Sequence, residues 1–162
     1  MIARYLVVAG RIRQEVANLE RVVTRAERAV AAVRQRPEDQ ELYLDAAALN
    51  LHDFYAGLER VFQHIAATID RSMPDGSEWH RDLLRQMQVP LAPIRPQVLS
   101  EETIQALDEF LRFRHVVRNI YTFAFDPERI EHLVQRLHPC FARVRNELLG
   151  FADFLEQLAQ ED

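Results

Sequence analysis

Apolar residues recur at steps of three and four along the first segment of the chain. Steps of this size place the residues on one face of an α-helix, and their regular alternation forms a heptad seam. We therefore predict one long amphipathic helix that ends before Pro37, where Glu38 and Asp39 favour the start of a second helix. The residues of the seam are Tyr5, Ala9, Ile12, Val16, Leu19, Val23, Ala26, Val30 and Val33.

The same spacing continues in a second segment, for which we predict a helix from about Pro37 to Arg71. The sequence MPDGS then gives a turn, and Ser77 is placed to cap a short helix that extends through Met87. The prolines in VPLAPIRPQVLS predict an extended connection after this short helix. The apolar positions of the second helix are Ala47, Leu51, Phe54, Leu58, Phe62, Ile65 and Ile69.

Two further helices are predicted in the second half of the chain. Ser100, which two glutamates follow, is a favourable start for a helix that ends near Phe125. The sequence Asp-Pro-Glu at 126–128 starts the last helix, in which Pro139 should produce a kink or a break. The apolar seam of the last helix is Ile130, Val134, Leu137, Phe141, Val144, Leu148, Phe151, Leu155 and Leu158.

No segment shows the sustained alternation of apolar and polar residues that marks a β-strand. The predicted fold class is therefore all-α, an up-and-down bundle of four main helices with one extra short helix. A chain of 162 residues, of which 48% are hydrophobic, is long enough to bury a core, and we predict a single domain over residues 1–162.

The charge and cysteine content narrow the class of protein. The net charge of −5 argues against a surface that binds polyanions as a whole, so any contact with nucleic acid must come from a local patch. The single Cys140 lies on an apolar seam, cannot form an internal disulfide and fits a reducing compartment. Charges interrupt the apolar run in MIARYLVVAGRIR too soon for a signal peptide or a membrane span. We expect a soluble, cytoplasmic protein that binds no membrane.

The segment RFRHVVRNIY combines three arginines with His, Asn and Tyr. On a helix, Arg114 and Tyr121 are seven residues apart and should share one shoulder of the core face, whereas His115, Arg118 and Asn119 should lie on the outer face. Such a face is most often only solvated. However, the segment contains no acidic residue that could pair with its arginines at helical spacing. The predicted core face of this helix is Ala106, Phe110, Phe113, Val117, Ile120 and Ala124.

The other histidines do not form a pattern of metal ligands. The spacings of His52 from His64 and of His132 from His138 differ from the i, i+4 spacing of helical ligand pairs. We therefore predict neither a metal site nor a cofactor. His80 is expected to pack within the turn before the short helix.

RHVVRNIY resembles the signature helix of the HepT-like branch of the HEPN superfamily, in which an Arg is followed by a polar residue, by a His five positions after the Arg, and then by x-Tyr. The segment LNLHDFYAGLERVFQHIAATID is similar to the second helix of that family. MPDGSEWHRDLLRQM is similar to its turn and short helix, and FLRFRHVVRNIYTFAFDPERIEHLV to its motif helix and the start of its last helix. The resemblance covers most of the chain and implies a bundle of the HEPN type.

The resemblance also implies a function, that of a metal-independent endoribonuclease used as a toxin. Members form homodimers whose paired motif helices make one RNA-cleaving groove. An MNT-type nucleotidyltransferase antitoxin silences each toxin by transferring AMP to the motif tyrosine. Residue by residue, the motif Arg falls on Arg114, its polar follower on His115 and the AMP-accepting Tyr on Tyr121. Arg112 and Arg118 are then candidate RNA-binding residues.

The motif His falls on Asn119, and here the chain departs from the pattern. An amide does not titrate near neutral pH, so Asn119 cannot deprotonate the 2′-hydroxyl of RNA. Arg114 and Arg118 can still stabilise charge on the phosphate, and His115 could act as a relocated base. Three hypotheses follow: a ribonuclease toxin or its weakened descendant, a catalytically degenerate HEPN domain that docks a nucleotidyltransferase and RNA, and a plain helical interaction protein.

Overall fold

The computed structural model describes residues 2–119, 121 and 124–161, and in these ranges it contains five α-helices and no β-strand. The predicted all-α class is therefore confirmed. A 3₁₀ turn (Pro37–Asp39) precedes the second helix, and a π-helical segment (Ile65–Asp70) follows it. Together the three segments are continuous and cover the region for which one helix was predicted. The helices are α1 (Ile2–Gln35), α2 (Gln40–His64), α3 (Trp79–Gln86), α4 (Glu101–Asn119) and α5 (Pro127–Glu161).

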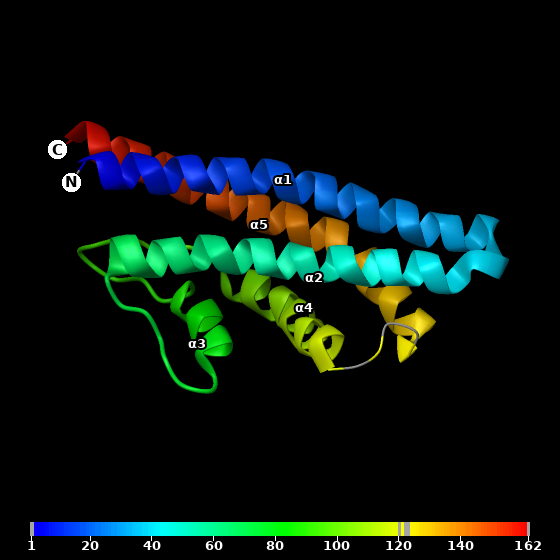
Figure 1. Cartoon of the computed structure of the whole chain (residues 1–162). Coiled ribbons are helices and arrows are strands. Elements are labelled where there is room, and N and C mark those ends of the chain that lie inside the picture. Colours follow the sequence, from blue (N-terminus) through cyan, green and yellow to red (C-terminus); the bar gives the residue numbers. More distant parts are fainter. Residues whose placement is uncertain (1, 120, 122–123, 162) are drawn as a thin grey trace.

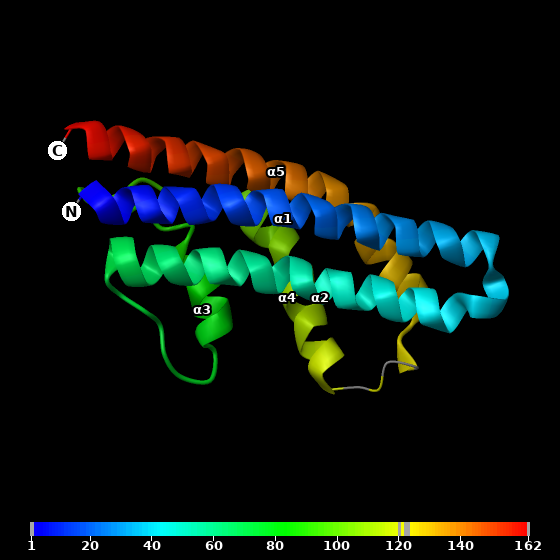
Figure 2. The same ribbon diagram turned by 45° about the horizontal axis from the view of Figure 1, so that its top comes forward.

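The four longer helices alternate in direction along the chain, so both termini lie at the same end of the bundle (Figure 1). Helix α1 packs against both α2 and α5 along most of its length. Helix α4 crosses α2 obliquely, and α3 lies beside it on the same side of the bundle (Figure 2). This arrangement confirms the predicted up-and-down bundle with one extra short helix.

The predicted apolar seams form the core. On α1 all but Tyr5 and Val33 of the seam are buried, and on α5 all but Leu158. Phe54 of α2 is completely buried and contacts Phe110 of α4 edge-on, with 5.3 Å between the ring centroids. It also meets a ring of α5, because its centroid lies 6.2 Å from that of Phe141. Phe54 therefore joins three helices, and edge-to-face ring pairs of this kind add to the energy of burial.

Helix α4 is shorter than predicted. It ends at Asn119, whereas the prediction extended it to about Phe125. The side chain of Asn119 donates a hydrogen bond to the carbonyl of His115, at 2.7 Å, one helical turn earlier. Of its predicted core face, Ala124 is exposed and Ile120 lies outside the described residues. The predicted start is confirmed, because Oγ of Ser100 accepts a hydrogen bond from the third amide of the helix.

The predicted cap of α3 was wrong. Glu78, not Ser77, precedes the first residue of α3, and no side chain caps this helix. Of the kink or break predicted at Pro139, the break is absent, because α5 continues to Glu161. Pro139 is exposed, so the carbonyl that lost its amide partner can bind water instead.

The connection after α3 was predicted to be extended, but residues 91–95 within it form a tight turn. Leu91 and Arg95 exchange backbone hydrogen bonds across it. The turn carries Arg95 into the interior, where its guanidinium binds both carboxylate oxygens of Asp70 at 2.5 and 2.8 Å. Both side chains are completely buried. The same guanidinium donates to three backbone carbonyls, so this ion pair fixes α3 and its loop to the end of α2.

Gly57 of α2 allows a close approach of α1. A Cβ atom at this position would lie 2.9 Å from Cδ2 of Leu19 and 2.5 Å from Oε1 of Glu15, both on α1. Gly10 and Gly150 also lie within helices, but no atom is within 4 Å of a Cβ at either. The three glycines therefore separate the effect of helix propensity from that of interhelical contact.

We expect Gly10→Ala and Gly150→Ala to raise the free energy of unfolding by about 0.5–1 kcal/mol each, because alanine is the better helix former. Gly57→Ala should lower it by about 1–3 kcal/mol, because the added methyl group overpacks the contact between α1 and α2. Urea unfolding of the three variants measures the difference. A Gly57→Ala protein as stable as the Gly10→Ala protein would show that the side chains of α1 move aside without cost.

Candidate functional site: a basic groove between three helices

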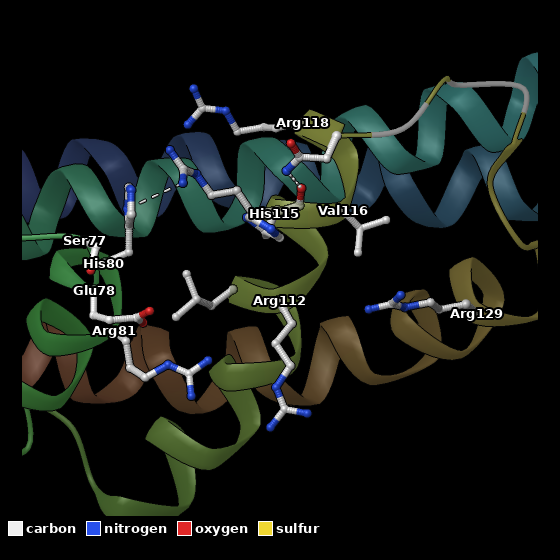
Figure 3. Close-up of a pocket in the computed structure, with 12 residues that line it drawn as sticks. Ser77, Glu78, His80, Arg81, Arg112, His115, Val116, Arg118 and Arg129 are labelled. Carbon is white, nitrogen blue, oxygen red and sulfur yellow. Dashed lines mark hydrogen bonds between the residues drawn. The ribbon is translucent and has the colours of Figure 1, made fainter.

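A groove of about 740 Å³ lies between the outer face of α4, the start of α3 and the first turn of α5. Its lining contains two histidines, His80 of α3 and His115 of α4, and a single acidic residue, Glu78. Figure 3 shows Arg112 and Arg118 extending from α4 toward opposite ends of the groove. The five arginines of the lining are Arg81, Arg112, Arg114, Arg118 and Arg129.

This lining has the opposite charge to the chain as a whole, which carries a net charge of −5. Two of its arginines have carboxylate partners, since Arg112 pairs with Asp108 and Arg114 with Glu59. Arg129 lies over the ring of Phe113, with its guanidinium carbon 5.6 Å from the ring centroid. The groove is therefore a local concentration of cations that suits a ligand with several negative charges.

The structure brings most of the predicted site residues together. Arg112, Arg114, His115, Arg118 and Asn119 all line the groove. The expected absence of a nearby carboxylate is wrong, because Arg112 pairs with Asp108 one helical turn earlier.

Tyr121 does not line the groove, although sequence periodicity placed it beside Arg114. The predicted arrangement of the two residues on one helix shoulder is wrong, because α4 ends at Asn119 and Tyr121 lies beyond its last turn. The side chain of Tyr121 is 75% exposed. It is therefore accessible from solvent.

Arg114 is held in the wall of the groove by two long contacts. Its Nη2 lies 3.6 Å from Oε1 of Glu59, and its Nη1 lies 3.5 Å from Nδ1 of His80. Charge-assisted hydrogen bonds of arginine are typically 2.7–2.9 Å long. The buried Nε of Arg114 has no hydrogen-bond partner among the described residues. The Nη groups therefore keep donor capacity that an anionic ligand could use, whereas Nε is enclosed by protein.

The contact between Glu59 and His80 was missed by sequence reasoning, which assigned His80 only to the packing of a turn. Oε2 of Glu59 lies 2.7 Å from Nδ1 of His80, and Glu59 is only 5% exposed. The sequence did indicate that Glu59 would be buried, because it shares a helix face with Tyr55 and Phe62, which are both completely buried. An acidic residue at such a position needs a partner, but the sequence did not reveal which residue would supply it.

The side chains of Asn119 and Cys140 have structural contacts within the protein. The Nδ2 of Asn119 donates to the carbonyl of His115, so this amide is hydrogen-bonded to the helix backbone. Burial raises the pKa of the Cys140 thiol to about 12, which keeps it protonated near neutral pH. The thiol is therefore part of the core, as predicted.

The described part of the chain contains neither a cluster of metal ligands nor a membrane-spanning helix. No three or more His, Cys, Asp or Glu side chains are placed there to hold a metal ion. In the same residues, no helix combines the length and apolar character needed to cross a membrane.

A family model described as HepT-like protein matches residues 46–155, which span more than half of the chain and include every residue that lines the groove. No curated protein and no solved structure matches the chain.

Proposed function

The chain belongs to the HepT-like family, and we propose that it is the toxin of a toxin–antitoxin pair, a metal-independent endoribonuclease that cleaves RNA in the basic groove. The single observation that carries the proposal is the composition of the groove, in which five arginines and two histidines face one acidic residue. Such a lining suits the phosphates of RNA, and histidine is a residue type that serves as general acid or base.

Each residue of the motif helix then has a role. Arg112 and Arg118, at opposite ends of the groove, bind phosphates along the RNA backbone. Arg114, with its spare donor capacity, stabilises the charge that develops on the reacting phosphate. His115 supplies a titratable group on this helix. Asn119 stands where the family motif has its catalytic histidine and can only orient a neighbouring group.

The proposal includes two partners that the family resemblance implies. The first is a second copy of the chain, with the motif helices of the two copies facing each other across one RNA-binding groove. The second is an MNT-type nucleotidyltransferase antitoxin that transfers AMP to Tyr121. The exposure of this side chain supports that assignment. AMP would add a phosphodiester anion near a group of arginines and oppose the binding of RNA.

A second candidate function is favoured by Asn119. Its amide is bonded to the helix backbone and does not titrate. A HEPN domain with this residue in place of the histidine could serve as a catalytically inactive docking partner of the nucleotidyltransferase that still binds RNA. The two candidates differ in whether the purified chain cleaves RNA.

We expect Arg114→Ala to reduce RNA cleavage by about 10²–10³-fold, the loss typical of removing one group that stabilises transition-state charge. Arg25→Ala, an exposed position of α1 outside the groove, is the matched control and should leave the rate unchanged. Cleavage of total RNA is followed by gel electrophoresis, with and without EDTA. Inhibition by EDTA, or full activity of the Arg114 variant, would reject the proposed mechanism.

We expect Asn119→His to increase RNA cleavage, because it returns a titratable side chain to the position of the family histidine. Asn119→Ala is the control, since it also removes the hydrogen bond to the His115 carbonyl but introduces no base. Loss of that bond should cost each variant about 0.5–1.5 kcal/mol of stability. If the histidine variant folds and cleaves no RNA while the natural chain is also inactive, the docking function is favoured.

We expect the chain to be a homodimer in solution. Light scattering at micromolar concentration should then give twice the 18.9 kDa mass of one chain. The double variant Arg112→Glu and Arg118→Glu neutralises the charge of the groove. If these side chains hold the two copies together, the variant should weaken the dimer. If they bind RNA, it should weaken RNA binding. A strictly monomeric mass for the natural chain would count against a groove shared by two copies.

A further inference from the structure

We infer that His80 is the general base of the proposed RNA cleavage, that Glu59 positions it, and that His115 is the general acid. The inference rests on the proposed ribonuclease function. It assigns the removal of the 2′-hydroxyl proton to a histidine outside the motif helix, and therefore explains how a chain with Asn119 in the motif can remain active.

The contact with Glu59 determines which nitrogen of His80 carries the proton. A carboxylate only accepts hydrogen bonds, so the 2.7 Å contact between Oε2 and Nδ1 requires a proton on Nδ1. In neutral imidazole, the other nitrogen, Nε2, then has a free lone pair. Arg114 competes weakly for Nδ1, because its Nη1 is 3.5 Å away. His80 is thus held in the tautomer that a general base needs, by the same logic as the acid–histidine pair of hydrolytic triads.

The ring of His80 is also held in place within the groove. Its centroid lies 3.6 Å from that of Trp79, with 30° between the two ring planes. The side chain lines the groove and is 27% exposed, so a bound ligand can reach it. Glu59, in contrast, is almost completely buried and cannot contact RNA. Its role is to position His80.

The second histidine of the groove has a different environment. His115 is exposed on α4, next to Arg114 in sequence, and no carboxylate of the described residues pairs with it. Figure 3 shows His80 near α3 and His115 on α4, on separate walls of the groove. A phosphate bound at Arg114 would lie between two titratable groups, which is the arrangement that a reaction with one proton removed and one proton added requires.

The proposed step is a balanced transesterification. Nε2 of His80 takes the proton of the RNA 2′-hydroxyl, and the 2′ oxygen forms a bond to the adjacent phosphorus. The bond from phosphorus to the 5′ oxygen of the next nucleotide breaks, and His115, in its imidazolium form, donates a proton to that oxygen. The products are a 2′,3′-cyclic phosphate and a 5′-hydroxyl. Exchange with water then returns each histidine to its starting state.

The test uses two substrates that differ in their need for an acid. One is a mixed-sequence RNA, and the other is the same RNA with sulfur in place of the 5′ oxygen at one linkage. The sulfur is a good leaving group and departs without a proton. His80→Ala should lose about 10²–10⁴-fold in rate on both substrates, the range typical of general acid–base groups. His115→Ala should lose rate on the natural RNA and recover most of it at the sulfur linkage.

Three further variants separate catalysis from structure. Added imidazole should restore part of the activity of His80→Gly, which a purely structural role would not allow. Glu59→Gln should reduce the rate less than His80→Ala does, and Glu59→Asp should recover part of that loss. His132→Ala, an exposed position of α5 outside the groove, should be unchanged.

Each outcome decides between the hypotheses. Full activity of His80→Ala, in a chain whose cleavage still depends on Arg114, would overturn the role of His80 and leave the ribonuclease function intact. Recovery of His80→Ala instead of His115→Ala on the sulfur substrate would reverse the two roles and overturn the assignment. A natural chain that cleaves neither substrate would overturn the ribonuclease function and this inference with it.

Discussion

The buried carboxylate of Glu59 is the constraint on which the groove depends. Removing a carboxylate from water is costly unless cations or hydrogen-bond donors surround it. Here His80 supplies the short contact and Arg114 a longer one, so three helices meet around one negative charge. The groove lies directly beside this cluster. The contacts of Glu59 with His80 and Arg114 therefore hold α2, α3 and α4 together beside the groove.

The arginines of this chain fall into two groups with different surroundings. On the outside of the bundle several pair with acids of a neighbouring helix, as Arg13 of α1 does with Asp153 and Glu156 of α5. Pairs of this kind contribute little to stability, because water screens both charges. For Arg81 and Arg118 of the groove, no ion pair is present among the described residues. The lining of the groove thus carries an excess of positive charge on an otherwise acidic protein, which suits a polyanion.

Helical periodicity predicted the elements well, because burial of an apolar stripe depends on spacing alone. It failed at the end of α4, which stops at Asn119 although the apolar spacing of the sequence continues through Ile120 and Ala124. It gathered the groove residues of α4 correctly, because they all lie on a single helix. His80 could not be found in this way, since its role comes from a contact with Glu59, 21 positions earlier in the chain. Contacts between helices depend on the angles at which the helices cross, and these angles cannot be predicted from the spacing of residues in the sequence.

The pairing of the first helix with the last has a consequence for the order of events during synthesis. The Arg13 contacts with α5 join residues 140 and 143 positions apart, so the part of α1 that packs against α5 remains uncovered until the final helix has left the ribosome. Arg129, in the first turn of that helix, also completes the lining of the groove. A nascent chain therefore lacks part of this cationic lining until its last helix has formed.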